Sequence, residues 1–332
     1  MFYYFWMASR ADIHLHTKYS GLAHIGFLRF PESVSDPKDV VKVAKANGME
    51  TISVTDHNEI KGALIAQKFA KEYGGINVIV GEEVSTAEGE VIGHFLNERI
   101  PKHLSAAETV DRIKAQGGLV VAPHPFSMHV PALGLLVDRL PIDGLEVMNA
   151  GHVDTYSNNK AREHALSGRW ALVGGSDSHS LRSIGCAYTE FDGQGPEDLR
   201  KAILNKTTRA GGVRIPMIKN IQWSLEVVME SDRLLMRALL HRKLPDDVCE
   251  PVINSVMELP THKKIAAILA SLGYFTPPVP FVAMIVGEKV LNRINSVPVH
   301  ESNGGAPVIP EIRKLIRDAR GGAQGQTKTR KR

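Results

Sequence analysis

Five apolar, strand-like runs in the first 180 residues each end in side chains of the kind that bind metal ions. The first run, ADIHLHT, places His14 and His16 two residues apart, and the last, ALVGGSDSH, places Asp177 and His179 in the same way. Because side chains alternate across a strand, residues two apart share a face and can contact one ion. The runs between them end at His57, at Glu82 and Glu83, and at His124.

Helix-like segments separate these runs up to about residue 213. Ser35 or Asp36 is the expected N-cap of one helix, and Ser105 with Glu108 forms a capping-box pattern ahead of another. A loop rich in glycine and small residues is expected after His16. Ligands gathered at the carboxyl ends of parallel strands are how a β/α barrel builds a site. The sequence therefore predicts an α/β barrel with a metal site at one end.

Composition permits this interpretation without selecting it, and the cysteine content bears on the compartment. The chain has 332 residues, of which 43% are hydrophobic, which suits a globular protein with a large buried core. Its two cysteines, Cys186 and Cys249, offer no disulfide framework, so a reducing cytoplasm is predicted. No run reaches the ~18 apolar residues of a membrane span. The apolar opening MFYYFWM is either a mis-called start before Met7 or a short latch at the barrel bottom.

The pattern changes after Gly211 and Gly212, where four helix-like segments follow one another with prolines between them. We expect residues 1–213 to form the catalytic domain and residues 214–310 a helical extension that caps the barrel or mediates homo-oligomerisation. Residues 311–332 hold eight Lys/Arg and two Asp/Glu, which leaves a net charge of −2 on the rest of a chain with net charge +4. This last segment is predicted to be a basic helix end and a disordered tail, with weak, salt-sensitive affinity for nucleic acid.

Seven motifs occur together over residues 11–213: DIHLHTKYS, TDHNEI, GEEVST, GEVIG, APHPF, GLEVMNA and GGSDSHSLRSIG. In sequence and order they resemble the motifs of the polymerase and histidinol phosphatase (PHP) family. The resemblance implies a distorted seven-stranded β/α barrel. It also implies two or three divalent ions (manganese, zinc or iron) and hydrolysis of a phosphoester by a metal-bridged hydroxide.

The resemblance also implies a ligand set, in which Glu83 is chosen over Glu82 by the family's G-x-E pattern. A first ion would take His14, His16, Glu83 and Asp177; a second would take His57 and His179; a third would take Glu83, Glu90 and His124.

Two positions depart from the family pattern. Gly21 stands where the family commonly places an Asp or His ligand of the second ion, and His24 in the same loop is the nearest substitute. Glu90 stands where many members have histidine, and a carboxylate there favours a harder ion such as manganese. His94, four residues further along the same run, is the rival ligand, although packing within the barrel is the expected fate of its side chain.

Several residues near the motifs have expected roles in catalysis. Lys18 and Arg182 are the nearest cations able to bind a phosphate, and each could equally be a surface charge. His179 and His152 are the candidates for the general acid.

Other polar residues are expected to support the ligands. Asp56 either orients His57 or caps the following helix, and Glu146 and Asn149 contact the substrate or a ligand. Isolated histidines elsewhere are expected to be packed or solvated: His103, His129, His164, His241, His262 and His300.

The sequence thus predicts a cytoplasmic, metal-dependent phosphoesterase acting on a small phosphorylated substrate. One alternative within the same architecture is an amidohydrolase that cleaves C–N bonds, but no run presents an obvious bridging lysine. The other alternative is a nucleic-acid-associated regulatory module, which the basic tail favours and the intact ligand set does not.

Overall fold

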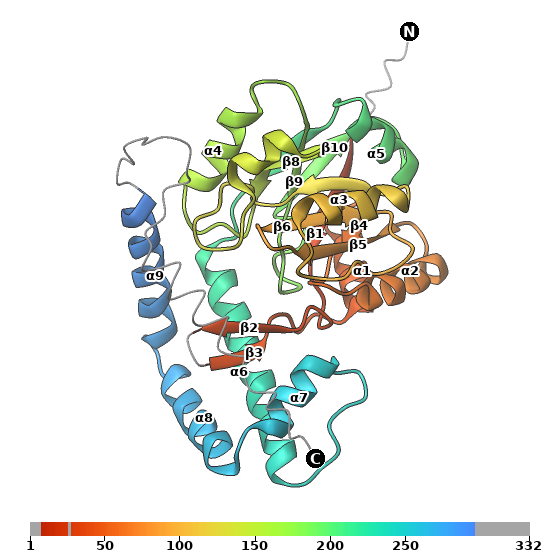
Figure 1. The fold of residues 1–332 in the computed structure, drawn as a ribbon. Helices are drawn as coiled ribbons and strands as arrows, with labels where there is room; N and C mark the ends of the chain where they lie inside the picture. The colour runs from red at the N-terminus through yellow and green to blue at the C-terminus, as the bar shows by residue number, and fades with distance from the viewer. Residues whose placement is uncertain (1–7, 26–27, 296–332) are drawn as a thin grey trace, which may run out of the picture.

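A nine-stranded sheet, curled into a nearly closed barrel, forms the centre of the computed structural model, which describes residues 8–25 and 28–295 (Figure 1). The order of the strands is β11-β10-β1-β4-β5-β6-β7-β8-β9. Parallel pairing joins β1 to β4, β4 to β5, β7 to β8 and β8 to β9. These strands are β1 (Ser9–Leu15), β4 (Thr51–Val54), β5 (Asn77–Ser85), β7 (Leu119–Ala122), β8 (Gly144–Asn149) and β9 (Ala171–Gly175).

Three further strands of the sheet pair antiparallel with their neighbours. They are β6 (Glu90–His94), between β5 and β7, β10 (Ala187–Phe191), which pairs with β1, and β11 (Arg209–Gly212), which pairs with β10. The predicted α/β barrel is confirmed, but the described sheet has nine strands instead of seven. The two additional strands are β10 and β11, which lengthen the sheet beyond β1 and lie against β9, where the barrel nearly closes.

Helices surround the barrel between successive strands. Asp36 is the N-cap of the first helix and accepts a hydrogen bond from the Lys38 amide at 3.0 Å, and Ser105 accepts one from the Glu108 amide at 3.1 Å, so both expected caps are found. The helices are α1 (Pro37–Ala46), α2 (Lys61–Tyr73), α3 (Ala106–Ala115), the 3₁₀ helix η1 (Gly134–Arg139), α4 (Tyr156–Ala165) and α5 (Gly195–Leu204).

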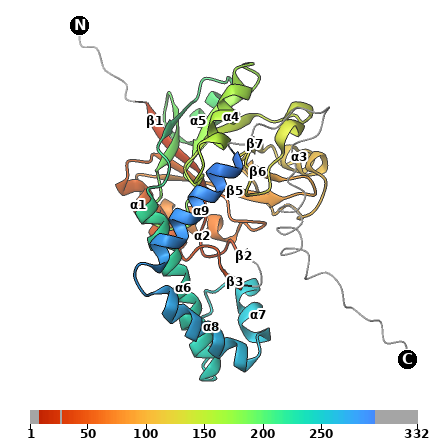
Figure 2. The ribbon, with the colours of Figure 1, turned by 90° about the vertical axis from the view of Figure 1, so that its left-hand side faces the viewer.

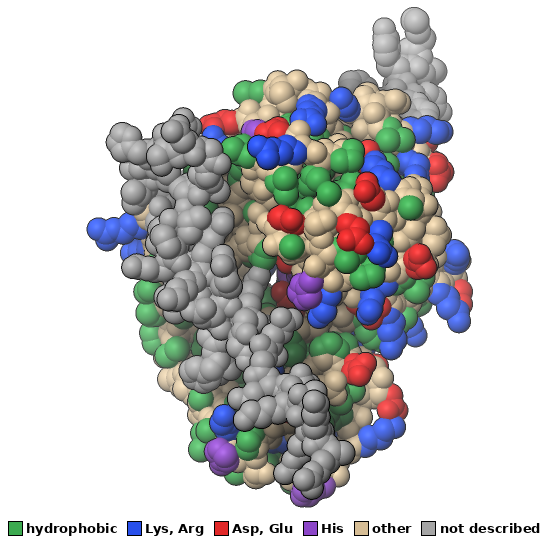
Figure 3. Space-filling view, in the orientation of Figure 1, with side chains coloured by type: hydrophobic (Ala, Val, Ile, Leu, Met, Phe, Trp, Pro, Cys, Tyr) green, Lys and Arg blue, Asp and Glu red, His purple; other side chains and the backbone are tan. Residues whose placement is uncertain are grey.

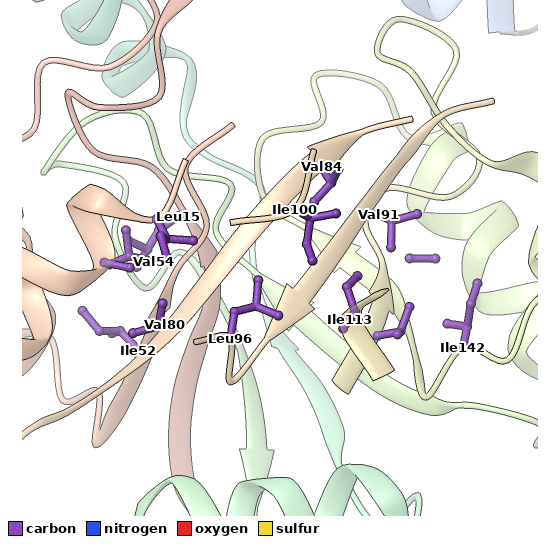
Figure 4. Packing of buried hydrophobic residues seen from close by; sticks show 14 of the residues in the cluster. Leu15, Ile52, Val54, Val80, Val84, Val91, Leu96, Ile100, Ile113 and Ile142 are labelled. Atoms are coloured by element: carbon purple, nitrogen blue, oxygen red, sulfur yellow. The ribbon is translucent and has the colours of Figure 1, made fainter. Parts of the chain in front are cut away.

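Branched apolar side chains of the strands and of α3 hold the barrel together. Figure 4 shows Ile52, Val54 and Val80 side by side on neighbouring strands, with Leu96 and Ile113 beyond them. These side chains are almost completely removed from water, and each fully buried Val, Leu or Ile contributes roughly 1.5 to 3 kcal/mol relative to an exposed one. The strand ends that carry the metal-type ligands are therefore built on a rigid base.

A small hairpin and a helical extension complete the fold. The hairpin, β2 (Leu22–Ile25) with β3 (Leu28–Pro31), follows the first motif, where the sequence had indicated only a loop. Figures 1 and 2 show it beside the first helix of the extension, and Tyr19 and Leu22 pack with Leu234 and Leu235 of that helix. The extension consists of α6 (Met217–Leu239), α7 (Glu250–Glu258), α8 (Thr261–Tyr274) and α9 (Val279–Asn295).

Apolar side chains remain exposed on the extension, along the lower left edge of the face in Figure 3, while charges of both signs are interspersed over the barrel. No single helix among the described residues could cross a membrane; α8 and the first part of α9 pass the length and composition test only as a pair bent by 86°. The expectations for MFYYFWM and Met7, for residues 296–310 and for the tail 311–332 lie outside the described residues.

Candidate metal centre

Four side chains from three strands converge at the carboxyl end of the barrel. His14 lies on β1, His16 one residue beyond it, Glu83 on β5, and Asp177 two residues beyond β9. The Nε2 atom of His14 lies 3.3 Å from Glu83 Oε2 and 3.6 Å from Asp177 Oδ1; that of His16 lies 3.4 Å and 3.3 Å from the same two atoms. Two imidazoles and two carboxylates thus face one point, as expected for the first ion.

Glu83 also reaches two further histidines. Its Oε1 lies 3.0 Å from His124 Nε2, just past β7, and its Oε2 lies 3.4 Å from His57 Nδ1, just past β4. Glu90, the first residue of β6, lies 3.8 Å from each of these two rings. The antiparallel turn from β5 to β6 brings Glu90 beside Glu83, so the three ligands expected for a third ion, Glu83, Glu90 and His124, are together.

Hydrogen bonds fix which ring nitrogen of each histidine can bind a metal. Nδ1 of His14 faces Glu146 Oε1 at 3.0 Å, and Nδ1 of His179 faces the Asp177 carbonyl oxygen at 3.0 Å, so both Nδ1 atoms carry the proton. Nδ1 of His16 hydrogen-bonds with Ser20 Oγ at 2.9 Å, while its buried Nε2 has no hydrogen-bond partner among the described residues. The lone pairs on Nε2 of His14 and His179 therefore point to the centre, as metal-ligating histidines require.

The remaining pair of expected ligands, His57 and His179, meets a carboxylate that the sequence analysis did not name. Glu32 directly follows β3, and its Oε2 lies 3.5 Å from His57 Nε2 while its Oε1 lies 3.7 Å from His179 Nε2. Gly21, at the family's usual ligand position, has no side chain to offer. The side chain of His24 is not among those described.

The charge of the cluster suits divalent cations. Burial opposes the charged form of the His14 ring, but the nearby carboxylates of Glu146 and Asp177 outweigh it and hold the pKa of His14 well above its usual value. Burial likewise opposes ionisation of Asp177 and Glu83, yet the surrounding imidazoles keep the pKa of each carboxyl well below its usual value. Buried carboxylates in such number need cationic partners, and metal ions supply them.

A second layer of polar groups orients these ligands. Glu146 Oε2 accepts a hydrogen bond from the His124 amide at 2.7 Å. Asn149 Nδ2 donates hydrogen bonds to Glu146 Oε2 and to Asp177 Oδ2. The carboxylate of Asp12 accepts hydrogen bonds from the amides of Ser176 and Gly185, and so fixes the loop that carries Asp177. Of the two roles expected for Glu146 and Asn149, these contacts describe the support of ligands.

Two ligands sit on strained backbone. His124 has a φ of 30° and Asp177 a φ of 49°, in the left-handed region that non-glycine residues rarely occupy. Such conformations cost of order 1 to 3 kcal/mol each and persist where the surrounding structure enforces them. Here the His124 amide donates to Glu146 Oε2 at 2.7 Å, and the Asp177 amide donates to the His14 carbonyl oxygen at 2.7 Å, which holds both backbones in place.

Two acidic neighbours of the ligands face elsewhere. Glu82 lies on the opposite face of β5 from Glu83, where it accepts the Ile100 amide, and burial raises the pKa of its carboxyl to about 8. Asp56 neither orients His57 nor caps α2, whose N-cap is Ile60. It instead accepts hydrogen bonds from the amide and hydroxyl of Thr17, so it fixes the turn after His16.

The two cations expected to bind phosphate are engaged in ion pairs. Lys18 Nζ lies 2.8 Å from Asp36 and 2.5 Å from Asp247, and the Arg182 Nε donates to Glu226 at 2.9 Å. Neither has a described contact with the metal-type cluster. Their role toward phosphate stays a prediction.

The remaining histidine candidates also have definite environments. His94 is buried with its Nδ1 2.9 Å from Ser53 Oγ, and burial lowers the pKa of its ring to about 3. His152 is buried beside His124, and its pKa is also lowered to about 3, by burial and by the neighbouring histidines. His129, expected to be packed or solvated, lies 3.5 Å from Asp154 and packs edge-on against His152.

A barrel of this kind, with histidines and carboxylates converging from its strand ends, defines a metal-dependent hydrolase scaffold. A family model of the PHP domain matches residues 12–122, and a PHP-associated model matches residues 155–208. The chain belongs to the PHP family. The first match contains His14, His16, His57, Glu83 and Glu90, and the second contains Asp177 and His179.

Similar proteins extend this finding. An uncharacterized protein of Methanocaldococcus jannaschii is 51% identical over 152 residues, which are 46% of this chain and 88% of that protein. A second uncharacterized protein of the same organism is 36% identical over 138 residues, 38% of this chain and 58% of that protein.

Solved structures with similar folds are only distantly related in sequence. PsfC from Pseudomonas syringae is 20% identical with a TM-score of 0.48, and the match covers 62% of this chain and 91% of that one. An amidohydrolase from Chromobacterium violaceum is 15% identical with a TM-score of 0.44, over 59% of this chain and 96% of that one.

Proposed function

We propose that this protein is a metal-dependent phosphoesterase that hydrolyses a small phosphorylated substrate at the carboxyl end of its barrel. The observation that carries the proposal is the convergence of His14 and His16 on the carboxylates of Glu83 and Asp177, within 3.3 to 3.6 Å. Membership of the PHP family supports the metal-dependent hydrolase class. The phosphoester bond is our inference from that class and from the charge of the centre.

Divalent ions, when bound, would lower the pKa of water towards ~7 and offset the negative charge of a phosphoryl group. We infer two or three such ions, of manganese, zinc or iron. His14, His16, Glu83 and Asp177 would hold the first. Glu83 and Glu90 with His124 form a site with two hard oxygen donors, which favours manganese over softer-binding zinc there.

Exposure indicates the side from which a substrate enters. The side chains of His14, His16 and Glu83 are at most 1% exposed, whereas those of His57, Asp177 and His179 are 18% to 19% exposed. The substrate phosphate would therefore approach past His57 and His179. Of the two candidates for protonating the leaving oxygen, His179 is at this open side and His152 is buried; His179 can fill the role only where its Nε2 does not hold an ion.

We infer that Arg182 contacts a phosphate that enters on this side. This side chain is 53% exposed, three residues beyond His179, and its guanidinium is turned toward Glu226. A planar guanidinium can bind two phosphate oxygens at once, which makes Arg182 the better phosphate contact. Lys18, held by two carboxylates, is the second candidate.

The test is a panel of small phosphoesters, assayed with manganese, zinc and iron, alongside amide and lactone substrates. We expect hydrolysis of at least one phosphoester, activity lost on chelation and restored by metal, and no activity in the His14→Ala and Asp177→Ala variants. Cleavage of amides with no phosphoester turned over would replace the proposal by the C–N hydrolase reading.

Some predictions about setting and partners remain proposals. We propose a cytoplasmic protein, which its two free thiols, Cys186 and Cys249, support. The proposal of a homo-oligomer rests on apolar side chains exposed on α8 and α9, among them Leu269 at 62% and Val286 at 52%. Weak nucleic-acid contact through residues 311–332 is proposed from their charge alone.

A further inference from the structure

The carboxylate of Glu32 lies between the Nε2 atoms of His57 and His179. Its two oxygens divide between the rings, Oε2 at 3.5 Å from His57 Nε2 and Oε1 at 3.7 Å from His179 Nε2. Both rings present Nε2 to it, because Nδ1 of His179 is bound to the Asp177 carbonyl and Nδ1 of His57 faces Glu83. The three side chains are each about one-fifth exposed, so this group forms the outer rim of the centre.

The backbone of Glu32 is fixed on both sides. Its amide donates to the Gly21 carbonyl oxygen at 3.1 Å, which closes the base of the β2–β3 hairpin. Its carbonyl oxygen accepts the indole N–H of Trp223, on α6, at 3.1 Å. The next residue, Ser33, donates its hydroxyl to the His16 carbonyl oxygen at 3.3 Å. Because these contacts hold the backbone, the carboxylate of Glu32 is preorganised.

The same helix α6 also holds the segment that carries His179. The Trp223 ring packs edge-on against the His179 ring, with centroids 6.0 Å apart at 61°. Glu226, three residues later, accepts hydrogen bonds from Ser180 Oγ and Arg182 Nε, each at 2.9 Å. One face of α6 therefore contacts both the hairpin end with Glu32 and the loop with His179.

We propose that Glu32 is the third protein ligand, with His57 and His179, of a divalent-ion site at the rim, and that Trp223 of α6 positions it. Two imidazole nitrogens and one carboxylate are a donor set that manganese, iron and zinc all accept. Gly21 has no side chain at the position where the family commonly places a ligand. Glu32, 11 residues further along the chain, would supply the oxygen ligand instead. This inference rests on the proposed function for its biological meaning, but its test reads metal binding directly.

The experiment compares the metal content and binding isotherms of the full chain with those of Glu32→Gln, which keeps the shape and removes the charge. Manganese and zinc are titrated into chelator-stripped protein by calorimetry, and bound ions are counted by elemental analysis. Glu72→Gln, on the exposed end of α2, is the matched control. We expect Glu32→Gln to lose one ion per chain, or to weaken one metal-binding step by about 100-fold or more, while binding at the remaining sites is unchanged. The loss of a residue that only supports a ligand costs about 10- to 100-fold in metal affinity.

Trp223→Phe tests the positioning role, since it keeps an aromatic ring and removes the indole donor. We expect it to weaken the same binding step by about tenfold, with full occupancy restored at high metal. Glu32→Asp keeps the charge on a shorter arm, so it should fall between wild type and Glu32→Gln. It replaces Glu32→Gln as the diagnostic variant if melting in chelator shows that Glu32→Gln is unfolded.

Isotherms of Glu32→Gln and Glu72→Gln that both match wild type would overturn the inference. So would a wild-type protein that takes up no ions at all, a result that rejects the proposed function as well. If wild type binds ions with the Glu32 dependence described but hydrolyses no phosphoester, only the proposed function fails.

Discussion

At the residue scale, Glu83 links the whole centre. Its two carboxylate oxygens lie within 3.0 to 3.4 Å of imidazole nitrogens of four histidines, His14, His16, His57 and His124. A carboxylate shared in this way can bridge two ions and set the distance between them. The preceding residue, Glu82, is equally buried but faces away, which provides a control of the same residue type on the same strand.

We expect Glu83→Gln to lower phosphoesterase activity by more than about 100-fold and to reduce the number of bound ions, because it removes a charge that several histidines share. Glu82→Gln should retain metal and activity. Burial raises the pKa of Glu82 to about 8, so its carboxyl is mostly protonated near neutrality and an amide replaces it closely. Activity and elemental analysis of both variants check this, and equal losses in the two would contradict the assignment of Glu83.

Glu90 and His94 are the two rivals on β6, and their surroundings differ. Glu90 lies 3.8 Å from both His57 and His124, whereas His94 contacts Ser53. We expect Glu90→Gln to weaken one metal-binding step, and His94→Leu to leave metal content unchanged while destabilising the fold by about 1 to 3 kcal/mol through the unpaired Ser53 hydroxyl. Metal titration and denaturant unfolding separate the two effects. A loss of metal in His94→Leu would make His94 the ligand.

The residues that sequence could name are those set in motifs at strand ends, such as His14 and Asp177, because alternation and barrel topology bring such ends together. Glu32 belongs to no motif, and its approach to His57 depends on a hairpin and on α6, which are set by long-range packing. One signal was present: Glu32 is the sole Asp or Glu between His16 and Asp36, in the loop where Gly21 leaves a ligand missing.

At the scale of elements, the glycines of β9 let the strand pass close to the ligands of β1. A Cβ atom on Gly175 would lie 2.3 Å from His14 Cβ and 2.8 Å from Glu146 Oε1. Real Cβ atoms do not approach this closely, so any side chain here must displace β1 or β9. The closeness of β9 to β1 therefore explains Gly175, while a Cβ on the preceding Gly174 would lie 2.7 Å from the Tyr188 carbonyl oxygen of β10.

Gly175→Ala is expected to destabilise the protein by about 1 to 3 kcal/mol or more, through overpacking, and to weaken metal binding because His14 moves. Gly273→Ala, on α8 with open space around it, is the matched control and should be neutral or stabilising by up to ~1 kcal/mol. Denaturant unfolding in chelator and metal titration measure the two effects. A Gly175→Ala protein as stable as wild type would show that the strands can separate without cost.

Elements with long apolar runs or clear caps, such as β5 and α3, were predictable from local sequence. Those without such runs were not. β11 is RAGG, and glycine has low strand propensity, so its pairing depends on β10. α4 begins YSNNK, whose Ser and Asn favour turns, and no side-chain cap marks its start. Tertiary packing decided both. The count of seven strands came from the family resemblance, and β10 and β11 are the two strands of the described sheet beyond it.

At the scale of the whole molecule, the proposed ligands lie on separate strand ends and just after the hairpin, so a bound ion would connect parts of the chain far apart in sequence. Such an ion binds the folded state and not the unfolded chain, and it stabilises by mass action. At a concentration 100 times the dissociation constant, the gain is about 2.7 kcal/mol per site.

We therefore expect the melting temperature to rise by about 5 to 10 °C per occupied site when manganese or zinc is added to chelator-treated protein. The Glu83→Gln variant should show a much smaller rise, because it binds the ions weakly. Thermal unfolding followed by circular dichroism measures both. An identical rise in the two proteins would mean that the ions bind elsewhere.

The hydrogen bond between the Trp223 indole and the Glu32 carbonyl has a consequence for the order of events on the ribosome, because it joins residues 191 positions apart. At about 5 to 20 residues per second, α6 emerges roughly 10 to 40 s after the hairpin that it holds in place. During that interval the nascent chain carries its early histidines without the support of α6. A newly made protein would therefore hold a rim ion at full affinity only after α6 has been synthesised and has packed against the hairpin.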